Sequence, residues 1–199
     1  MRKFFRRINK IIIFICAKIF ALFIYDRKYI KGKWFTSRYA SLGAEGWKWI
    51  LLDVKYRFFT GKNRGVPFPI SPHNTISNPS NIIFDVDDLN LFQGYGKYFQ
   101  MMENSKIIIG KGTWIAPNVG FITANHSINN LDKHDDPKDI VIGENCWIGM
   151  NSVILPGVKL ANNTIVGAGS IVTKSFLVGN CMIAGNPAKI VKNYLNNFN

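Results

Sequence analysis

The sequence predicts an all-β protein, a parallel β-helix built from six-residue repeats, with a basic helical extension before it. Apolar residues recur every six positions along the last third of the chain, and glycine follows many of them. One such unit, a short strand and a turn, cannot bury its own apolar face, but stacked units bury a continuous column. The series that we expect to point inward is Ile142, Ile148, Ile154, Leu160, Val166, Val172, Val178, Ala184 and Ile190.

The same phase is present upstream at Ile109, Ile115 and Phe121, and then it breaks. Residues 124–140 interrupt the repeat with Asn, Asp, His and Lys, which cannot fill an apolar interior, so we expect a loop insertion that leaves the coil. The glycine in the second position of the repeat, as at Gly143 and Gly149, is expected to allow a tight corner.

Charge divides the chain into two parts. Residues 1–70 hold sixteen Lys and Arg against three acids, whereas residues 71–199 hold nine of each. A repeat region without net charge argues against nucleic acid as a partner. We expect a basic amphipathic helical region over residues 1–65 and the β-helix domain over 66–199, with irregular first coils up to residue 100.

The N-terminal apolar stretch, Ile11–Tyr25, is interrupted by Lys18 and is shorter than the roughly twenty residues that span a bilayer. Its composition predicts a helix lying on an anionic membrane surface, with its basic residues at the headgroups. The alternative is a helix packed on its own protein. A second amphipathic helix is expected over Gly46–Phe59, with burial as the usual fate of the nearby Trp and Phe residues.

Two stretches of the repeat resemble the hexapeptide-repeat acyltransferases: V-I-G-E-N-C-W-I-G-M-N-S-V-I-L-P-G-V from Val141, and A-G-N-P-A-K-I-V-K from Ala184. With I-A-P-N-V from Ile115, they are similar to the branch of galactoside, maltose and xenobiotic O-acetyltransferases. The resemblance implies a left-handed β-helix, a homotrimer with active sites between subunits, and acetyl-CoA as the acyl donor without a metal.

His126, in T-A-N-H-S, is the candidate general base. An alcohol needs a group that takes its proton as it attacks the thioester, and imidazole has a suitable pKa. The resemblance assigns the same role to this residue. His134 is expected to be an exposed loop residue, and His73 a turn residue.

The resemblance also implies the remaining site residues. The backbone N–H of Met150 would stabilise the oxyanion, and Trp147 would line the acyl or acceptor site or pack between subunits. Coenzyme A would meet the residues Ala168, Thr173, Lys174, Lys189 and Lys192. Lysine at the last two positions contacts a phosphate as a point charge, without the bidentate fork of arginine.

The acceptor is expected to be a saccharide, free or lipid-linked, in surface polysaccharide synthesis at the cytoplasmic face of a membrane. Gln100 and Glu103 could bind its hydroxyls or face solvent. The alternatives are N-acetylation of an amino sugar, a non-catalytic sugar-binding trimer, and a γ-type carbonic anhydrase. The last would need all three histidines of the chain on one zinc ion.

Overall fold

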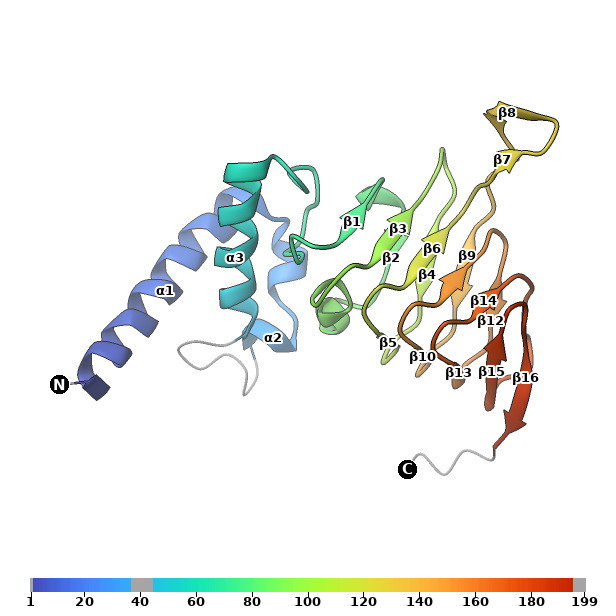
Figure 1. Cartoon of the computed structure of the whole chain (residues 1–199). Helices are drawn as coiled ribbons and strands as arrows, with labels where there is room; N and C mark the ends of the chain where they lie inside the picture. The colour runs from blue at the N-terminus through green and yellow to red at the C-terminus, as the bar shows by residue number, and fades with distance from the viewer. Residues whose placement is uncertain (1, 37–44, 195–199) are drawn as a thin grey trace.

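The protein consists of a helical cap packed on one end of a three-sided parallel β-helix (Figure 1). The structure is a computed structural model, and it describes residues 2–36 and 45–194. The coils stack away from the cap, so the C-terminal strands lie at the far end (Figure 1). The expected parallel β-helix is therefore confirmed as stacked parallel sheets.

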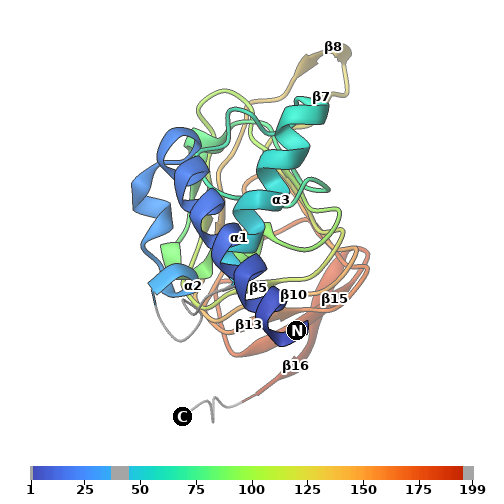
Figure 2. The same cartoon turned by 90° about the vertical axis from the view of Figure 1, so that its left-hand side faces the viewer.

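The two longest helices that the structure describes in the cap, α1 (Arg2–Ile24) and α3 (Glu45–Thr60), lie side by side (Figures 1 and 2). The predicted second helix over residues 46–59 is confirmed by α3. In the part of the chain that the structure describes, none of the helices combines the length and apolarity needed to cross a bilayer. The helices are α1 (Arg2–Ile24), η1 (Arg27–Ile30), α2 (Lys33–Thr36) and α3 (Glu45–Thr60).

Three sheets form the sides of the β-helix, and between residues 107 and 172 the chain visits them in the order B, C, A. Sheet B contains β2 (Ile82–Ile83), β4 (Ile107–Ile109), β9 (Ile140–Ile142) and β12 (Lys159–Leu160). Sheet C contains β5 (Trp114–Ile115), β10 (Trp147–Ile148), β13 (Thr164–Val166), β15 (Cys181–Gly185) and β16 (Ala188–Asn193). Sheet A contains β1 (Thr75–Ile76), β3 (Tyr98–Gln100), β6 (Gly120–Ile122), β11 (Val153–Ile154) and β14 (Ile171–Val172).

Two further 3-10 helices belong to the irregular first coils. They are η3 (Pro79–Asn81) and η4 (Val86–Phe92).

We name the corners of the β-helix by the sheets that they join. The chain passes from sheet A to sheet B at the A–B corner, and from sheet C to sheet A at the C–A corner. The predicted insertion leaves at the A–B corner as a hairpin of β7 (His126–Ser127) and β8 (Asn130–His134).

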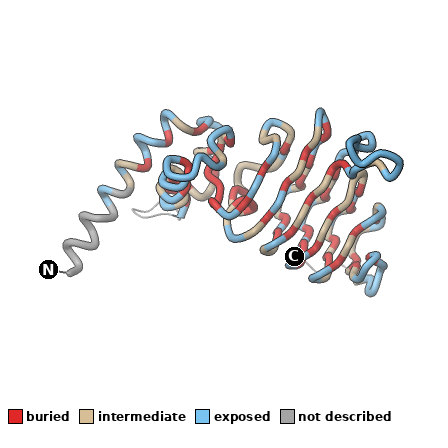
Figure 3. Tube along the Cα trace, turned by 45° about the horizontal axis from the view of Figure 1, so that its top comes forward, coloured by how far each residue is buried: buried red, intermediate tan, exposed pale blue. Residues whose placement is uncertain are grey.

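The hexad register is confirmed from Ile109 to Val172. Successive coils pair Ile142 with Leu160 and Ile154 with Val172, which places residues eighteen positions apart on top of each other. All the apolar positions of this part of the series are buried, and the strands alternate buried and less buried residues along each coil (Figure 3). Stacking of identical positions therefore creates the core.

The last three positions of the predicted series are wrong. Val178 is 73% exposed, because Phe176 takes its place beside Leu160. Ile183, and not Ala184, then pairs with Val166. Ile190 lies on β16, which turns back antiparallel to β15 and ends the coil. The register is lost here because the corner after β14 is shorter than a full hexad.

The role expected for the second-position glycines is also wrong. Neither Gly143 nor Gly149 has a positive φ angle; instead, a Cβ atom on Gly143 would lie 2.6 Å from the backbone nitrogen of Asn162 in the next coil. These glycines allow close stacking of coils. The left-handed corners are formed two residues later by a column of Asn and Gly: Asn145, Asn151, Gly157, Asn163 and Gly169. Such residues adopt this conformation at the lowest cost.

An aromatic cluster joins the cap to the first coils. The Phe68 ring packs on Tyr29 at 5.0 Å and on Phe92 at 4.6 Å, and Phe99 stacks on Phe121 farther inside the β-helix. Burial of aromatic residues is confirmed for these and for Trp47, but Phe58 and Phe59 of α3 are about three quarters exposed. Cys146 and Cys181 are buried free thiols, and burial raises the pKa of the Cys146 thiol.

Candidate active site

The β7–β8 hairpin projects from the A–B corner (Figure 1), and His126 on β7 is exposed. Its Nδ1 atom lies 2.7 Å from the carbonyl oxygen of Leu131. A carbonyl can only accept a hydrogen bond, so the neutral ring carries its proton on Nδ1. The lone pair of Nε2 is then free to accept a proton from another molecule.

His134 is exposed, as expected for a loop residue, but it also contacts His126. The two residues are paired across the hairpin, and their ring centroids are 4.3 Å apart with an interplanar angle of 34°. The sequence does not indicate this contact, because the register of the hairpin cannot be read from the composition of the insertion. The neighbouring His134 ring restricts how the His126 imidazole can turn.

The base of the hairpin is closed by backbone hydrogen bonds between the segments that enter and leave the insertion. The Lys138 N–H donates to the carbonyl of Thr123 at 2.8 Å, and the Asp135 N–H to that of Asn125 at 2.9 Å. A small hollow of about 190 Å³ opens beside this base. It is lined by Asn125, Asp135, Asp136, Lys138, Leu155, Pro156 and Thr173. Thr173, a predicted coenzyme A contact, therefore lies at the same corner as His126.

Gln100 and Glu103 also belong to the A–B corner. Gln100 pairs with Ile122, four residues before His126, and its Oε1 accepts a hydrogen bond from the Thr123 N–H at 3.2 Å. Its carbonyl group therefore helps to shape the corner. Glu103 is exposed in the turn after β3, with a left-handed φ of 50°. Lys174 is exposed beside Thr173, with its Nζ atom 5.8 Å from the centroid of the Phe176 ring.

A second group of predicted residues lies at the C–A corner. Met150 follows β10, and its carbonyl accepts a hydrogen bond from the Gly169 N–H at 2.8 Å, which places Ala168 in the coil directly beside it. Among the residues described, no acceptor is assigned to the Met150 N–H. Both Met150 and Ala168 are exposed. The site residues of this corner thus form a second small surface.

Trp147 lies on the outer face of sheet C, in register with Trp114 on β5 and Ile165 on β13. Both Trp side chains are more than half exposed, and they border a hollow of about 500 Å³ that also includes Asn145 and Tyr194. Lys189 and Lys192 are exposed on β16, at the edge of the same sheet. Sheet C therefore carries an aromatic face and a basic edge.

One chain does not bring all the predicted residues together. His126, Thr173 and Lys174 lie at one edge of sheet A, whereas Met150 and Ala168 lie at the other. About five residues of extended chain separate the two corners, which corresponds to roughly 16 Å. A thioester held at one corner therefore cannot reach both groups within a single chain.

No group of three or more His, Cys, Asp or Glu side chains is placed to hold a metal ion in residues 2–36 and 45–194. His73 stacks on Tyr95, with ring centroids 4.4 Å apart, while the other two histidines share the hairpin. This arrangement gives no support to the carbonic anhydrase alternative.

Comparisons with known proteins match the β-helix. Residues 139–174 match the family "Bacterial transferase hexapeptide (six repeats)". Galactoside O-acetyltransferase of Escherichia coli K12 is 37% identical over 95 residues, covering 46% of each chain. A second E. coli K12 protein, "Putative lipopolysaccharide biosynthesis O-acetyl transferase WbbJ", is 33% identical over 128 residues, which are 57% of this chain and 61% of that protein.

Among solved structures, a maltose O-acetyltransferase from Clostridium difficile 630 is 34% identical, with a TM-score of 0.46 over 50% of this chain and 54% of that chain. The present chain spans about half the length of the curated relatives it matches. Over its β-helix, this chain is similar to the hexapeptide-repeat acetyltransferases, in the branch that includes galactoside and maltose O-acetyltransferases, and the resemblance inferred from the sequence is confirmed.

Proposed function

We propose that this protein is an acetyl-CoA-dependent O-acetyltransferase that acts on a saccharide hydroxyl. The observation that carries the proposal is the geometry of His126. Its Nδ1 is bonded to a backbone carbonyl and its Nε2 is exposed at a projecting hairpin, which is the arrangement that a general base requires. The similarity of the repeat region to O-acetyltransferases supports the same chemistry.

In this mechanism, Nε2 of His126 takes the proton of the acceptor hydroxyl while the oxygen attacks the carbonyl carbon of the thioester. The carbonyl oxygen becomes an oxyanion, which accepts a hydrogen bond from the Met150 N–H. The carbon–sulfur bond then breaks. The thiolate of coenzyme A takes the proton from His126, so that the free thiol leaves and the base is regenerated.

The site is proposed to lie between subunits of a homotrimer. Because His126 and Met150 occupy opposite edges of sheet A, the A–B corner of one subunit would meet the C–A corner of the next. Coenzyme A would then contact Thr173 and Lys174 from one subunit and Ala168 from its neighbour, with Lys189 and Lys192 near its phosphates. Trp147, Gln100 and Glu103 remain the candidates for contact with the acceptor.

The acceptor is proposed to be a saccharide of surface polysaccharide synthesis, free or lipid-linked. One relative is named for lipopolysaccharide biosynthesis, and the chain carries a basic helical cap before its β-helix. We place the protein in the cytoplasm, at the inner face of the cell membrane, where acetyl-CoA is available. The free thiols of Cys16, Cys146 and Cys181 fit a reducing compartment.

The decisive experiment compares His126→Ala with His134→Ala in transfer of acetyl from acetyl-CoA to a panel of sugars. His126→Ala should lower turnover by about 10² to 10⁴, with coenzyme A affinity little changed. His134→Ala, a matched change in the same hairpin, should lower it less than about tenfold. Near-full activity of His126→Ala would contradict its role as the general base. Chelators should have no effect on turnover, because the proposed mechanism uses no metal ion.

A mixing experiment tests the shared site. His126→Ala and Ala168→Trp should each be inactive alone, because each damages one of the two corners. In co-expressed mixed trimers, about a quarter of the interfaces would combine two intact corners and restore that share of activity. If the acetyl-transfer activity of the mixed trimers stays at background, the active site is not built from two subunits.

A further inference from the structure

The two long helices of the cap expose many large apolar side chains. Phe23 of α1 is 84% exposed, and Phe58 and Phe59 of α3 are 76% and 75% exposed. Such a surface on a water-facing helix pair needs a partner. Among the described side chains of the two helices, the other large apolar ones that are exposed are Ile11, Ile12, Ile15, Ile19, Phe20, Leu22, Leu52 and Tyr56.

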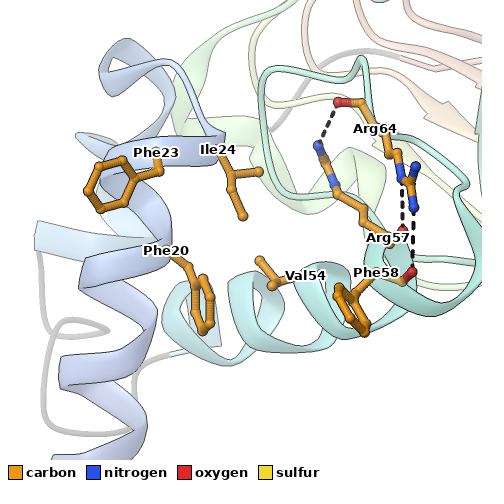
Figure 4. Close-up of a pocket in the computed structure, with 7 residues that line it drawn as sticks. All are labelled: Phe20, Phe23, Ile24, Val54, Arg57, Phe58 and Arg64. Atoms are coloured by element: carbon orange, nitrogen blue, oxygen red, sulfur yellow. Dashed lines mark hydrogen bonds between the residues drawn. The ribbon is translucent and has the colours of Figure 1, made fainter.

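The surface is hollowed where the two helices meet. Figure 4 shows Phe20 and Phe58 on either side of the space between the helices, with Ile24 and Val54 pointing into it and Phe23 at its outer edge. The hollow has a volume of about 480 Å³. Arg57 at its base is paired with Asp53, and the exposed Arg64 at the rim donates hydrogen bonds to the carbonyl oxygens of Arg57 and Phe58. An apolar chain fits such walls better than a polar ligand does.

Basic residues border both apolar hollows of the cap. Lys18 and Arg27 border a second hollow of about 260 Å³ beside α1, together with Ala21, Leu22, Ile30 and Trp47. Neither hollow has a carboxylate among its lining residues. Of the acids near these helices, Asp53 is buried against Arg57, while Glu45 is paired with Lys48 and Asp26 with Lys28. The rim is therefore suited to an anionic surface.

We propose that the exposed faces of α1 and α3 form one docking surface for an anionic lipid bilayer. Phe23, Phe58 and Phe59 enter the acyl region, while Lys18, Arg27 and Arg64 lie at the headgroups. This proposal rests on the membrane location given under Proposed function and extends it from the first helix to a two-helix surface. A second copy of this chain fits less well, because it would bring two basic rims together.

Flotation of the full-length protein with vesicles tests this surface. The wild type should bind vesicles that contain phosphatidylglycerol and bind pure phosphatidylcholine weakly. The variant with Phe58→Gln and Phe59→Gln should lose about ten- to a hundredfold in partition coefficient. The matched control, Leu177→Gln with Val178→Gln, changes two adjacent exposed apolar residues of the β-helix and should bind as the wild type does.

Three results would overturn the proposal: no binding of the wild type to anionic vesicles, equal binding of the Phe58 and Phe59 variant, or equal loss in the control. The proposal would also fail if the Phe58 and Phe59 variant formed a smaller oligomer while its flotation did not change. The surface would then be an interface between subunits of this protein. Acetyl transfer to a soluble sugar should be unchanged in both variants. If no variant or wild type transfers acetyl while flotation behaves as expected, the proposed function fails and the docking surface stands.

Discussion

The β-helix and the helical cap are stabilised in different ways. In the β-helix, the same six-residue pattern recurs, so each apolar residue packs on its equivalent one coil away. In the cap, no pattern recurs, and its position depends on one aromatic cluster and a few individual polar contacts with the first coils. A repeat distributes stability over many similar contacts, whereas the cap concentrates it in a few.

The contact with the largest expected effect is the buried ion pair of the cap. Arg57 donates from Nε and Nη2 to the two carboxylate oxygens of Asp53 at 2.9 and 2.8 Å. The same carboxylate accepts hydrogen bonds from the Tyr25 hydroxyl and the Ile70 N–H. Burial, together with the Asp53 charge, raises the pKa of the Tyr25 phenol. The Asp53 side chain on α3 thus links the end of α1 and the segment before the β-helix through hydrogen bonds.

Asp53→Ala should destabilise the cap by about 3 to 5 kcal/mol, because it leaves the Arg57 charge buried without its partner. Urea unfolding and the rate of proteolysis of α1 would measure the change. Glu45→Ala is the matched control: it removes an exposed ion pair with Lys48 on the same helix and should cost less than about 1 kcal/mol. Equal effects of the two substitutions would contradict the view that the cap depends on a few buried contacts.

Lys97 lies between the two regions and provides a pH-dependent test. Its ammonium group is buried and donates to the carbonyls of Leu91 and Gln93 at 2.8 and 2.6 Å. Burial lowers its pKa to about 8. The unfolded chain therefore binds more protons at this group between pH 8 and its ordinary value of 10.5, and its contribution to stability rises with pH across that window.

Lys97→Met should remove this contribution. The stability of the wild type relative to the variant should increase by up to about 3 kcal/mol as the pH is raised from below 8 towards 10.5. Urea unfolding at several pH values would show it, and subtraction of the two curves cancels groups such as Cys146 that titrate in both proteins. A difference that is flat or falls with pH would contradict a buried, charged Lys97.

Close stacking of coils gives the third test. A Cβ atom on Gly143 would lie within 2.7 Å of backbone atoms of Ala161 and Asn162, so Gly143→Ala should cost about 1 to 3 kcal/mol. Gly65, in the loop after α3, has no atom within 4 Å of such a Cβ, and Gly65→Ala should be neutral or slightly stabilising. A neutral Gly143→Ala would show that the coils can separate without loss.

The sequence predicts the two regions to different extents. The hexad period locates the buried residues from Ile109 to Val172 correctly, because a residue of the repeat meets its own equivalent in the next coil. It fails at Val178, where one corner is shortened and nothing local marks the change. The column of Asn and Gly at the corners is visible in the sequence, two residues after the second-position glycines. It indicates that the left-handed corners lie there and not at those glycines.

The candidate site shows the same division. The sequence and the resemblance locate His126 in the insertion, but not the hairpin register that brings His134 onto its ring. They also cannot show that Met150 and Ala168 lie at the corner opposite His126, because this depends on the order of the three sheets. The cap is harder to predict from the sequence than the β-helix. The exposure of Phe58 and Phe59 depends on how α3 packs on α1, and no sequence repeat indicates that packing.

The smallest expected effect compares the same backbone conformation in both regions. Asn163, at a corner of the β-helix, has a φ of 59°, and Asn63, in the loop after α3, has a φ of 58°. Each also donates a side-chain hydrogen bond, Asn163 to Oδ1 of Asn180 at 3.0 Å and Asn63 to the carbonyl of Asn74 at 3.3 Å. Alanine at either position should cost about 1 kcal/mol, since a Cβ atom opposes the left-handed region, whereas glycine should cost less. Urea midpoints of the four variants would test this order. If alanine is costly at Asn163 and harmless at Asn63, the cost belongs to the stacking of the repeat and not to the backbone conformation that the two positions share.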